Sequence, residues 1–123
     1  MSTLSGNFFV LKNVDSDKIL WQGIAASATA AIEAAVATGA DLSGIDMCGF
    51  DLTGLSCGCA KMAGAEYKGA TLRNANLAGS DFTGATFAGA DLRGANFGGC
   101  VMKGANLSGA VVDEGTSFKG TEW

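Results

Sequence analysis

The sequence predicts an all-β solenoid, and two observations carry this prediction. Starting at Ala40, residues 40–114 divide into fifteen units of five residues without a break. The third residue of every unit is apolar, and the fifth residue is glycine in twelve of the fifteen units. A period of five matches neither an α-helix, with its period of about 3.6, nor a single strand, with its period of about 2. A short fixed period of this kind is typical of a chain that coils and stacks on itself.

Each unit is predicted to be a short strand followed by a bend. The first and third residues of an extended run point to the same side, so both positions are expected to line the interior. The first position is alanine in ten units. Glycine at the fifth position tolerates the backbone angles of a corner. Repeated bends coil the chain, and successive coils would pair through backbone hydrogen bonds at a spacing of about 4.8 Å.

The units resemble the repeat of the pentapeptide-repeat family, whose motif reads A-(D/N)-L-x-x. The stretches "ADLRG" and "ANFGG", residues 90–94 and 95–99, show the match, and the fifteen units together cover 75 of the 123 residues. The resemblance implies a right-handed, four-sided parallel β-helix, whereas the period alone is compatible with other polygons. Four sides give coils of twenty residues, and the repeats then make just under four coils.

Sorting the third positions by a twenty-residue coil gives four apolar ladders through the expected core. The ladders are Leu42, Met62, Phe82 and Met102; Met47, Tyr67, Phe87 and Leu107; Leu52, Leu72, Leu92 and Val112; and Cys57, Leu77 and Phe97. The bulky first positions Ile45, Phe50 and Leu55 all fall in the first coil. Leu55 stands beside the small Cys57, which suggests a volume exchange that keeps the core filled. The extra bulk could also reach into a cap.

Residues 1–39 differ from the repeats and are expected to form an N-terminal cap. The runs "NFFVLKN" and "KILWQG", separated by the turn signal "VDSD", predict a β-hairpin. The stretch "SATAAIEAAVATG" predicts a short helix that Ser27 caps and that terminates at Gly39. Such a cap would cover the strand edges and the core at one end of the solenoid.

Residues 115–123 are expected to form a C-terminal capping tail, because the stretch "DEGTSFKGTEW" loses the five-residue register by one residue. Phe118 and Trp123 are the aromatic residues of this segment and are expected to fold over the last coil. An apolar end that is incompletely covered would instead favour an end-to-end homodimer, so both a monomer and this dimer stay open.

The residues that usually carry chemistry do not converge in this pattern. The chain has no histidine, which removes the commonest general base and zinc ligand. The four cysteines occupy unlike positions of the repeat: Cys57 a core position, Cys59 a corner, Cys48 an outward position and Cys100 an alanine position. Zinc spacings such as C-x₂-C are also missing. We therefore expect no catalytic residues, no metal and no cofactor, and the chain is predicted not to be an enzyme.

Acidic residues recur at outward positions and define a candidate binding wall. This acidic wall consists of Asp41, Asp46, Glu66 and Asp81. The coil arithmetic puts Lys61 between Asp41 and Asp81, which favours a solvated face over a binding surface. Arg73 and Arg93 are expected to pair with the neighbouring carboxylates, Asp51 and Asp91, for little net stability.

The charge and the flanking signals restrict the partners and the compartment. A net charge of −4 and a pI near 4.5 argue against direct binding to nucleic acid or to an anionic membrane. No secretory signal opens the chain, and the longest apolar stretch is too short and too polar to span a bilayer. Four cysteines without an export signal indicate a reducing compartment, so a cytoplasmic location is expected.

The function expected from these features is a rigid protein–protein interaction scaffold or inhibitor for a protein partner that the sequence does not identify. The resemblance supplies the alternative. Some pentapeptide-repeat proteins mimic DNA and bind the type II topoisomerases DNA gyrase and topoisomerase IV, which inhibits these enzymes or protects them from quinolones. The repeat segment of this chain carries eight acidic and five basic residues, a net charge of only −3. DNA mimicry is therefore the second hypothesis.

Overall fold

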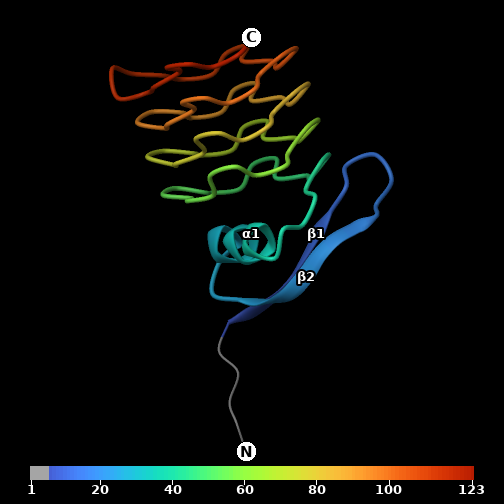
Figure 1. Cartoon of the computed structure of the whole chain (residues 1–123). Coiled ribbons are helices and arrows are strands. Elements are labelled where there is room, and N and C mark those ends of the chain that lie inside the picture. Colours follow the sequence, from blue (N-terminus) through green and yellow to red (C-terminus); the bar gives the residue numbers. More distant parts are fainter. Residues whose placement is uncertain (1–5) are drawn as a thin grey trace, which may run out of the picture.

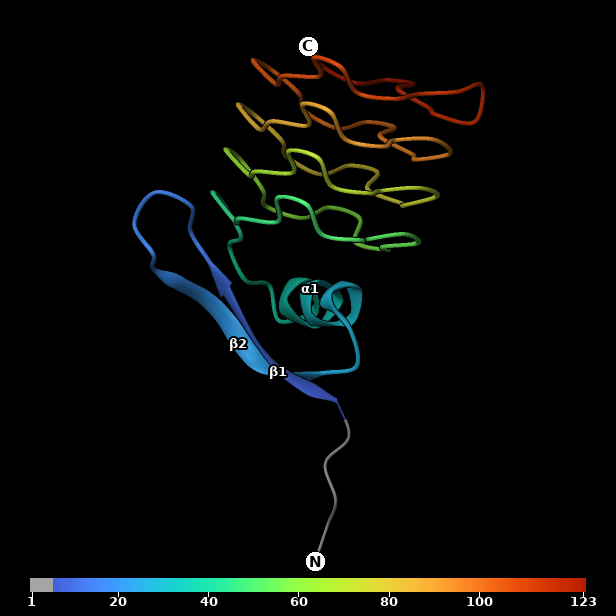
Figure 2. The same ribbon diagram turned by 180° about the vertical axis from the view of Figure 1, so that it is seen from behind.

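The computed structural model describes residues 6–123, in which a hairpin and a helix precede a stack of coils (Figure 1). Strand β1 (Asn7–Lys12) and strand β2 (Ile19–Ala25) form an antiparallel hairpin, and helix α1 (Ala28–Ala37) follows. Helix α1 lies at the lower end of the stack, and the hairpin runs beside it (Figures 1 and 2). The hairpin and the helix that the sequence predicts are both present.

The hairpin has one covered face and one open face because its side chains alternate. Leu11 pairs with Trp21 across the two strands, and this side of the sheet packs against the core. Phe8 pairs with Ile24 on the other side, where both remain exposed. Asn13 closes the turn, because its side-chain oxygen accepts the backbone N–H groups of Asp15 and Ser16.

Helix α1 begins and ends at the residues that the sequence predicts for its caps. The hydroxyl oxygen of Ser27 accepts the N–H of Ala30, and Gly39 adopts a φ of +77° beyond the last turn. Ala31, Ile32 and Ala35 form a buried stripe. Among residues 6–123, no helix has the length and apolar character needed to cross a bilayer.

The repeat segment forms coils of twenty residues joined by parallel β-bridges. Bridges link Asp41 to Lys61 and Lys61 to Asp81, and the same offset of twenty recurs throughout the segment. Each coil has four bridge positions, and we name the resulting bridge columns the first to fourth face, starting at Asp41, Asp46, Asp51 and Ser56 respectively. The prediction of a parallel β-solenoid is confirmed.

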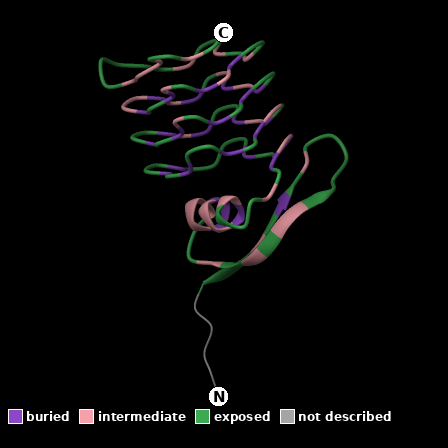
Figure 3. Cartoon of the chain, in the orientation of Figure 1, coloured by how far each residue is buried: buried purple, intermediate pink, exposed green. Residues whose placement is uncertain are grey.

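The interior of the coils is filled by the third positions, as predicted (Figure 3). Every third-position residue from Leu42 to Met102 is at most 4 % exposed. The middle of the stack is aromatic: the rings of Tyr67 and Phe87 stack at 5.3 Å, and Phe82 meets Phe87 edge-on at 5.2 Å.

Some residues predicted to be inside are not fully buried, and the large ones among them are Phe50, Leu107 and Val112. Val112 is 52 % exposed and Leu107 is partly buried, because the last coil has no further coil above it. Phe50, a first-position residue of the first coil, is 41 % exposed. The expected ladders therefore hold up to Met102 and fail where the stack ends.

Residues 115–123 continue the solenoid and do not fold over it as a tail. Ser117 bridges to Asn96 with an offset of twenty-one residues, and the ring of Phe118 stacks on that of Phe97 at 5.2 Å. The one extra residue is taken up at the preceding corner, where the carboxylate of Asp113 accepts the N–H of Gly115. The apolar end of the stack is consequently formed by this last coil itself.

The lower edge of the first coil is partly covered by the N-terminal segment. In higher coils, the second-position N–H donates to a carbonyl of the coil below, as Asn76 does to Leu55. In the first coil, Asp46 donates instead to the carbonyl of Lys12, and Ser56 donates to the carboxylate of Glu33 at 2.8 Å. The carboxylate of Glu33 therefore replaces the carbonyl acceptor that a lower coil would supply. The sequence did not predict this role.

Candidate interaction surface

The outward second-position aspartates are held in fixed positions by local hydrogen bonds. The carboxylate of Asp41 accepts the hydroxyl of Ser43 at 2.6 Å and its N–H at 3.0 Å. Asp81 is bound in the same way by Thr83, two residues further along. Hydrogen bonds to the ionised form stabilise it, and they lower the pKa of both Asp41 and Asp81 below the ordinary value. Both groups are therefore ionised and oriented at neutral pH.

The acidic wall predicted from the sequence is divided between two faces. On the first face, Lys61 bridges both Asp41 and Asp81, so the acidic column is interrupted by a cation as expected. On the second face, Asp46 bridges directly to Glu66, and no cation separates them in the column. The structure thus brings the four acidic residues onto adjoining faces but does not make them a continuous stripe.

The bridge column of the fourth face differs from the others in its lack of charge. It consists of Ser56, Asn76, Asn96 and Ser117. Asn96 accepts the N–H of Gly98, which is the same local bond that fixes the aspartates elsewhere. The five-residue repeat therefore gives every face the same backbone conformation, whereas the outward side chains differ from face to face.

The comparison with known families agrees with this geometry. A family model described as pentapeptide repeats, in eight copies, matches residues 65–104 and 80–113. Residues 65–113 of the chain are therefore pentapeptide repeats. The residues matched by the family model include the aromatic middle of the stack, where the coils are most regular.

Solved pentapeptide-repeat structures also resemble the chain. One, from the cyanobacterium Cyanothece 51142, is 26% identical, covers 63% of this chain and 59% of its own, and has a TM-score of 0.47. Another, from the thylakoid lumen of Arabidopsis thaliana, is 38% identical, covers 66% of this chain and 59% of its own, and has a TM-score of 0.44. This chain thus spans about three fifths of the length of each. No curated protein matched it.

The third face of the pentapeptide repeats carries the ion pairs. Arg93 donates two hydrogen bonds to Asp91, at 2.9 and 2.8 Å, and Arg73 lies 3.9 Å from the same carboxylate. The expected pairing of the arginines is therefore found at Asp91. Asp51 binds Thr53 instead and has no ion pair within residues 6–123. The hydrogen bonds from Arg93 and the adjacent positive charges lower the pKa of Asp91 to about 2.

The low pKa of Asp91 makes its contribution to stability dependent on pH. Because the folded pKa of about 2 lies below the ordinary 3.8, the contribution is complete above about pH 4 and is lost as the pH falls through 2. Asp91→Asn should therefore lower the free energy of unfolding at pH 7 and have little effect at pH 2, as measured by urea unfolding. Asp46→Asn keeps a side-chain acceptor and is the control. Equal effects of Asp91→Asn at both pH values would contradict the assignment.

The four thiols of this chain lie in two environments. Cys57 and Cys100 are buried, whereas Cys48 and Cys59 are exposed, and all four are free. Burial raises the pKa of Cys57 to about 12, and it also raises that of Cys48. Within residues 6–123, no group of cysteine and acidic side chains is placed to hold a metal ion.

This difference predicts the pattern of thiol labelling. Two thiols should react with a maleimide in the native protein, and all four in denaturant. Cys48 should react slowly for an exposed thiol, because its raised pKa leaves little thiolate at a given pH. Mass spectrometry of timed samples would measure this, with Cys48→Ser removing only the slow phase of native labelling. Native labelling of three or four thiols would contradict the described packing.

One corner of the repeats replaces alanine with hydrogen-bond donors. These donors are Ser80, Cys100 and Thr121, and they donate to the carbonyls of Cys57, Leu77 and Phe97 in the coil below. Cys100 was expected in an alanine position, but its hydrogen bond to the coil below, which Ser80 and Thr121 also form, was not predicted. The signal was available, because these residues follow one another at offsets of twenty and twenty-one.

The open face of the hairpin is a second surface that the sequence analysis did not single out. Phe8 is 64 % exposed and Ile24 is 47 % exposed, and Val10 lies beside them on the same strand face. The stretch "NFFVLK" is apolar at four consecutive positions, so a strand here places apolar side chains on both of its faces. The fold covers only one of these faces. This surface lies on the hairpin of β1 and β2 (Figure 1), whereas the acidic wall lies on the coils.

Proposed function

We propose that the chain is a rigid, non-catalytic interaction module that binds a protein partner through its acidic wall. In this proposal the coils form a right-handed, four-sided β-helix, and residues 6–39 act as its N-terminal cap. The observation that carries the proposal is the fixation of outward carboxylates: Asp41 and Asp81 are both oriented by two hydrogen bonds from the same unit.

Fixed side chains favour binding because less conformational entropy is lost when the partner docks. An exposed aspartate usually samples several rotamers, whereas these carboxylates are ionised and restrained before binding. Their charges also increase the rate of association with a basic surface. The acidic wall is thus suited to a partner that presents lysine or arginine side chains at regular intervals.

The capping role of residues 6–39 is supported by the contacts of the first coil. The carbonyl of Lys12 and the carboxylate of Glu33 accept N–H groups that would otherwise lie at an open edge. The free thiols suit a reducing compartment, and we propose that the module acts in the cytoplasm.

The test compares affinity capture from the host lysate by three proteins. The first is the wild type, and the second carries Asp41→Asn, Asp46→Asn, Glu66→Gln and Asp81→Asn. The third is a control that removes four charges elsewhere, through Asp15→Asn, Asp17→Asn, Asp51→Asn and Glu114→Gln. A partner lost only by the second protein supports the proposal. A partner retained by all three, or lost equally by the second and third, contradicts it.

DNA mimicry at a type II topoisomerase is the second candidate function. The direct succession of Asp46 and Glu66 on the second face favours it, since two carboxylates follow each other without an intervening cation. Lys61 on the first face weakens the similarity to a phosphate backbone. The same three proteins added to a DNA gyrase supercoiling assay test this candidate. Inhibition by the wild type and the control but not by the neutralised wall would support it, and no inhibition by the wild type would exclude it.

A further inference from the structure

The upper end of the stack leaves backbone hydrogen-bonding groups unpaired. In lower coils, a third-position N–H donates to the coil above, as Phe87 does to the carbonyl of Asn106 at 2.7 Å. The corresponding N–H groups of Leu107, Val112 and Phe118 have no acceptor within residues 6–123. An unpaired strand edge of this kind readily pairs with another strand.

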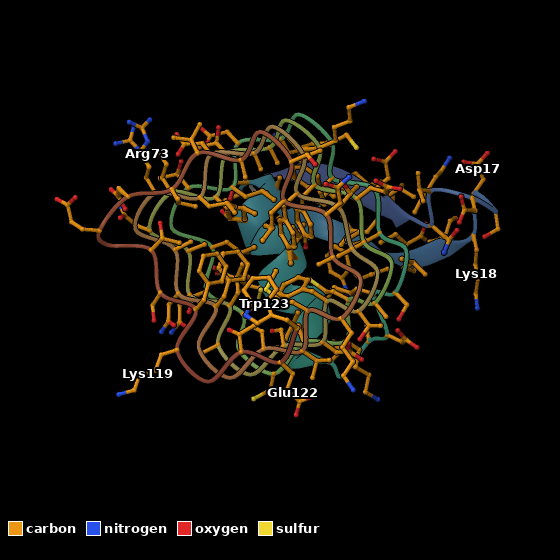
Figure 4. The ribbon with its side chains drawn as sticks, turned by 90° about the horizontal axis from the view of Figure 1, so that it is seen from above. Asp17, Lys18, Arg73, Lys119, Glu122 and Trp123 are labelled. Atoms are coloured by element: carbon orange, nitrogen blue, oxygen red, sulfur yellow. The ribbon has the colours of Figure 1, made fainter. Side chains whose placement is uncertain are left out.

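The same end exposes apolar side chains. Val111 is 48 % exposed, Val112 is 52 % exposed and Trp123 is 60 % exposed. Viewed from above, Trp123 lies over the core (Figure 4). The lower end, in contrast, is covered by helix α1 (Figure 1). The two ends of the stack therefore differ, and the upper one combines an open edge with an apolar centre.

Two opposite charges flank one corner of this end. Lys119 lies at the end of the fourth face and Glu122 at the start of the first face, on either side of Gly120 and Thr121. Both side chains point outward from the rim (Figure 4). Within residues 6–123, neither forms an ion pair.

We propose that this end binds a second copy of the same chain, end to end, across a twofold axis. The axis passes through the corner at Gly120 and through the opposite corner at Gly109. It exchanges the first face with the fourth, so Lys119 of each copy lies opposite Glu122 of the other. A twofold interface must be complementary to itself, and this placement satisfies that condition with two ion pairs.

The same axis also matches the apolar positions. Phe118 of one copy comes opposite Trp123 of the other, and Leu107 comes opposite Val112. The facing strands run antiparallel, which suits pairing of the open edges. An axis through the middle of the second and fourth faces would instead bring Glu122 opposite Asp113, a pair of like charges. The charges therefore favour the corner axis over this one.

Sedimentation equilibrium of the full chain over a range of concentrations tests this dimer. Lys119→Glu and Glu122→Lys should each weaken dimerisation by about tenfold, because each converts two attractive pairs into two repulsive ones. The double variant Lys119→Glu/Glu122→Lys restores the pairs in reverse and should recover the affinity. Lys68→Glu, on the second face away from this end, is the matched control and should have no effect.

A dimer that the single reversals weaken and the double reversal restores supports the proposal. Three results would overturn it: a monomer at every concentration, a dimer indifferent to the single reversals, or a double variant as weak as the singles. All three substituted side chains are exposed, so the variants should fold like the wild type, as circular dichroism can verify. The wall variants used to test partner binding leave Lys119 and Glu122 unchanged, so the two proposals can fail separately.

Discussion

Replacing Phe87 by alanine is expected to lower the free energy of unfolding by about 3–5 kcal/mol, the largest effect of any single change considered. Phe87 is fully buried and its ring contacts three others: it stacks on Tyr67 at 5.3 Å and meets Phe82 and Phe97 edge-on at 5.2 and 5.4 Å. The coils are joined by backbone bonds above and below, so they cannot collapse freely into the space that the ring leaves.

Urea unfolding followed by circular dichroism measures this loss. Phe8→Ala removes a ring of the same size from the open face of the hairpin, where Phe8 is 64 % exposed, and should cost less than about 1 kcal/mol. Similar losses for the two variants would show that the aromatic middle of the stack does not dominate stability.

Ser80→Ala is expected to cost about 1–3 kcal/mol, although it removes only one oxygen atom. The hydroxyl of Ser80 is completely buried, donates to the carbonyl of Cys57 at 3.2 Å and accepts the N–H of Ala60 at 3.0 Å. In other units the first-position N–H donates to a carbonyl three residues back, as Ala65 does to Met62. At Ala60 this partner is the serine, so alanine would leave a buried N–H unpaired.

The control for this change is Ser56→Ala, which removes an exposed hydroxyl from the fourth face and should be nearly neutral. Ser80→Cys should recover part of the loss, because Cys100 already donates to the carbonyl of Leu77 one coil higher. Thermal unfolding of the three variants gives their order. An unchanged midpoint for Ser80→Ala would mean that water or another carbonyl replaces the serine.

The interior of the coils could be predicted from the sequence because each unit repeats one local rule. A strand alternates its side chains, and a residue in the left-handed region closes the corner, so the period alone places Leu42 and its equivalents inside. The rule tolerates exceptions: Cys59 and Asn74 adopt φ values of +58° and +59° where most units have glycine. Neighbouring coils impose the corner even on residues that favour it less.

The ends could not be predicted in the same way, because they depend on contacts between unlike segments. The role of Glu33 arises when a helix meets a coil that has no coil below it, and no pattern within the helix reveals this. The last residues differ from the expected tail for a related reason: a one-residue shift in the sequence suggests the end of the solenoid, whereas a corner absorbs the shift and Ser117 bridges again.

The sequence predicted which residues make up the acidic wall, but it did not predict how their side chains are oriented. The sequence placed Asp41 and Asp81 in one column with Lys61 between them, and the structure shows the same order. It did not show that neighbouring hydroxyls fix the carboxylates, because that depends on side-chain conformation. The open hairpin face was not predicted, because the sequence of a strand does not show which of its faces another segment covers.

The constant offset between bridged residues has a consequence for how such a chain can lengthen. Adding twenty residues would insert a whole coil and leave every later side chain above its former neighbours. Adding five would instead rotate everything beyond the insertion by one face relative to the hairpin, with the core still filled. The orientation of Lys119 and Glu122 relative to the N-terminal cap can therefore take only a few distinct values. Each insertion or deletion of five residues would change this orientation by one face.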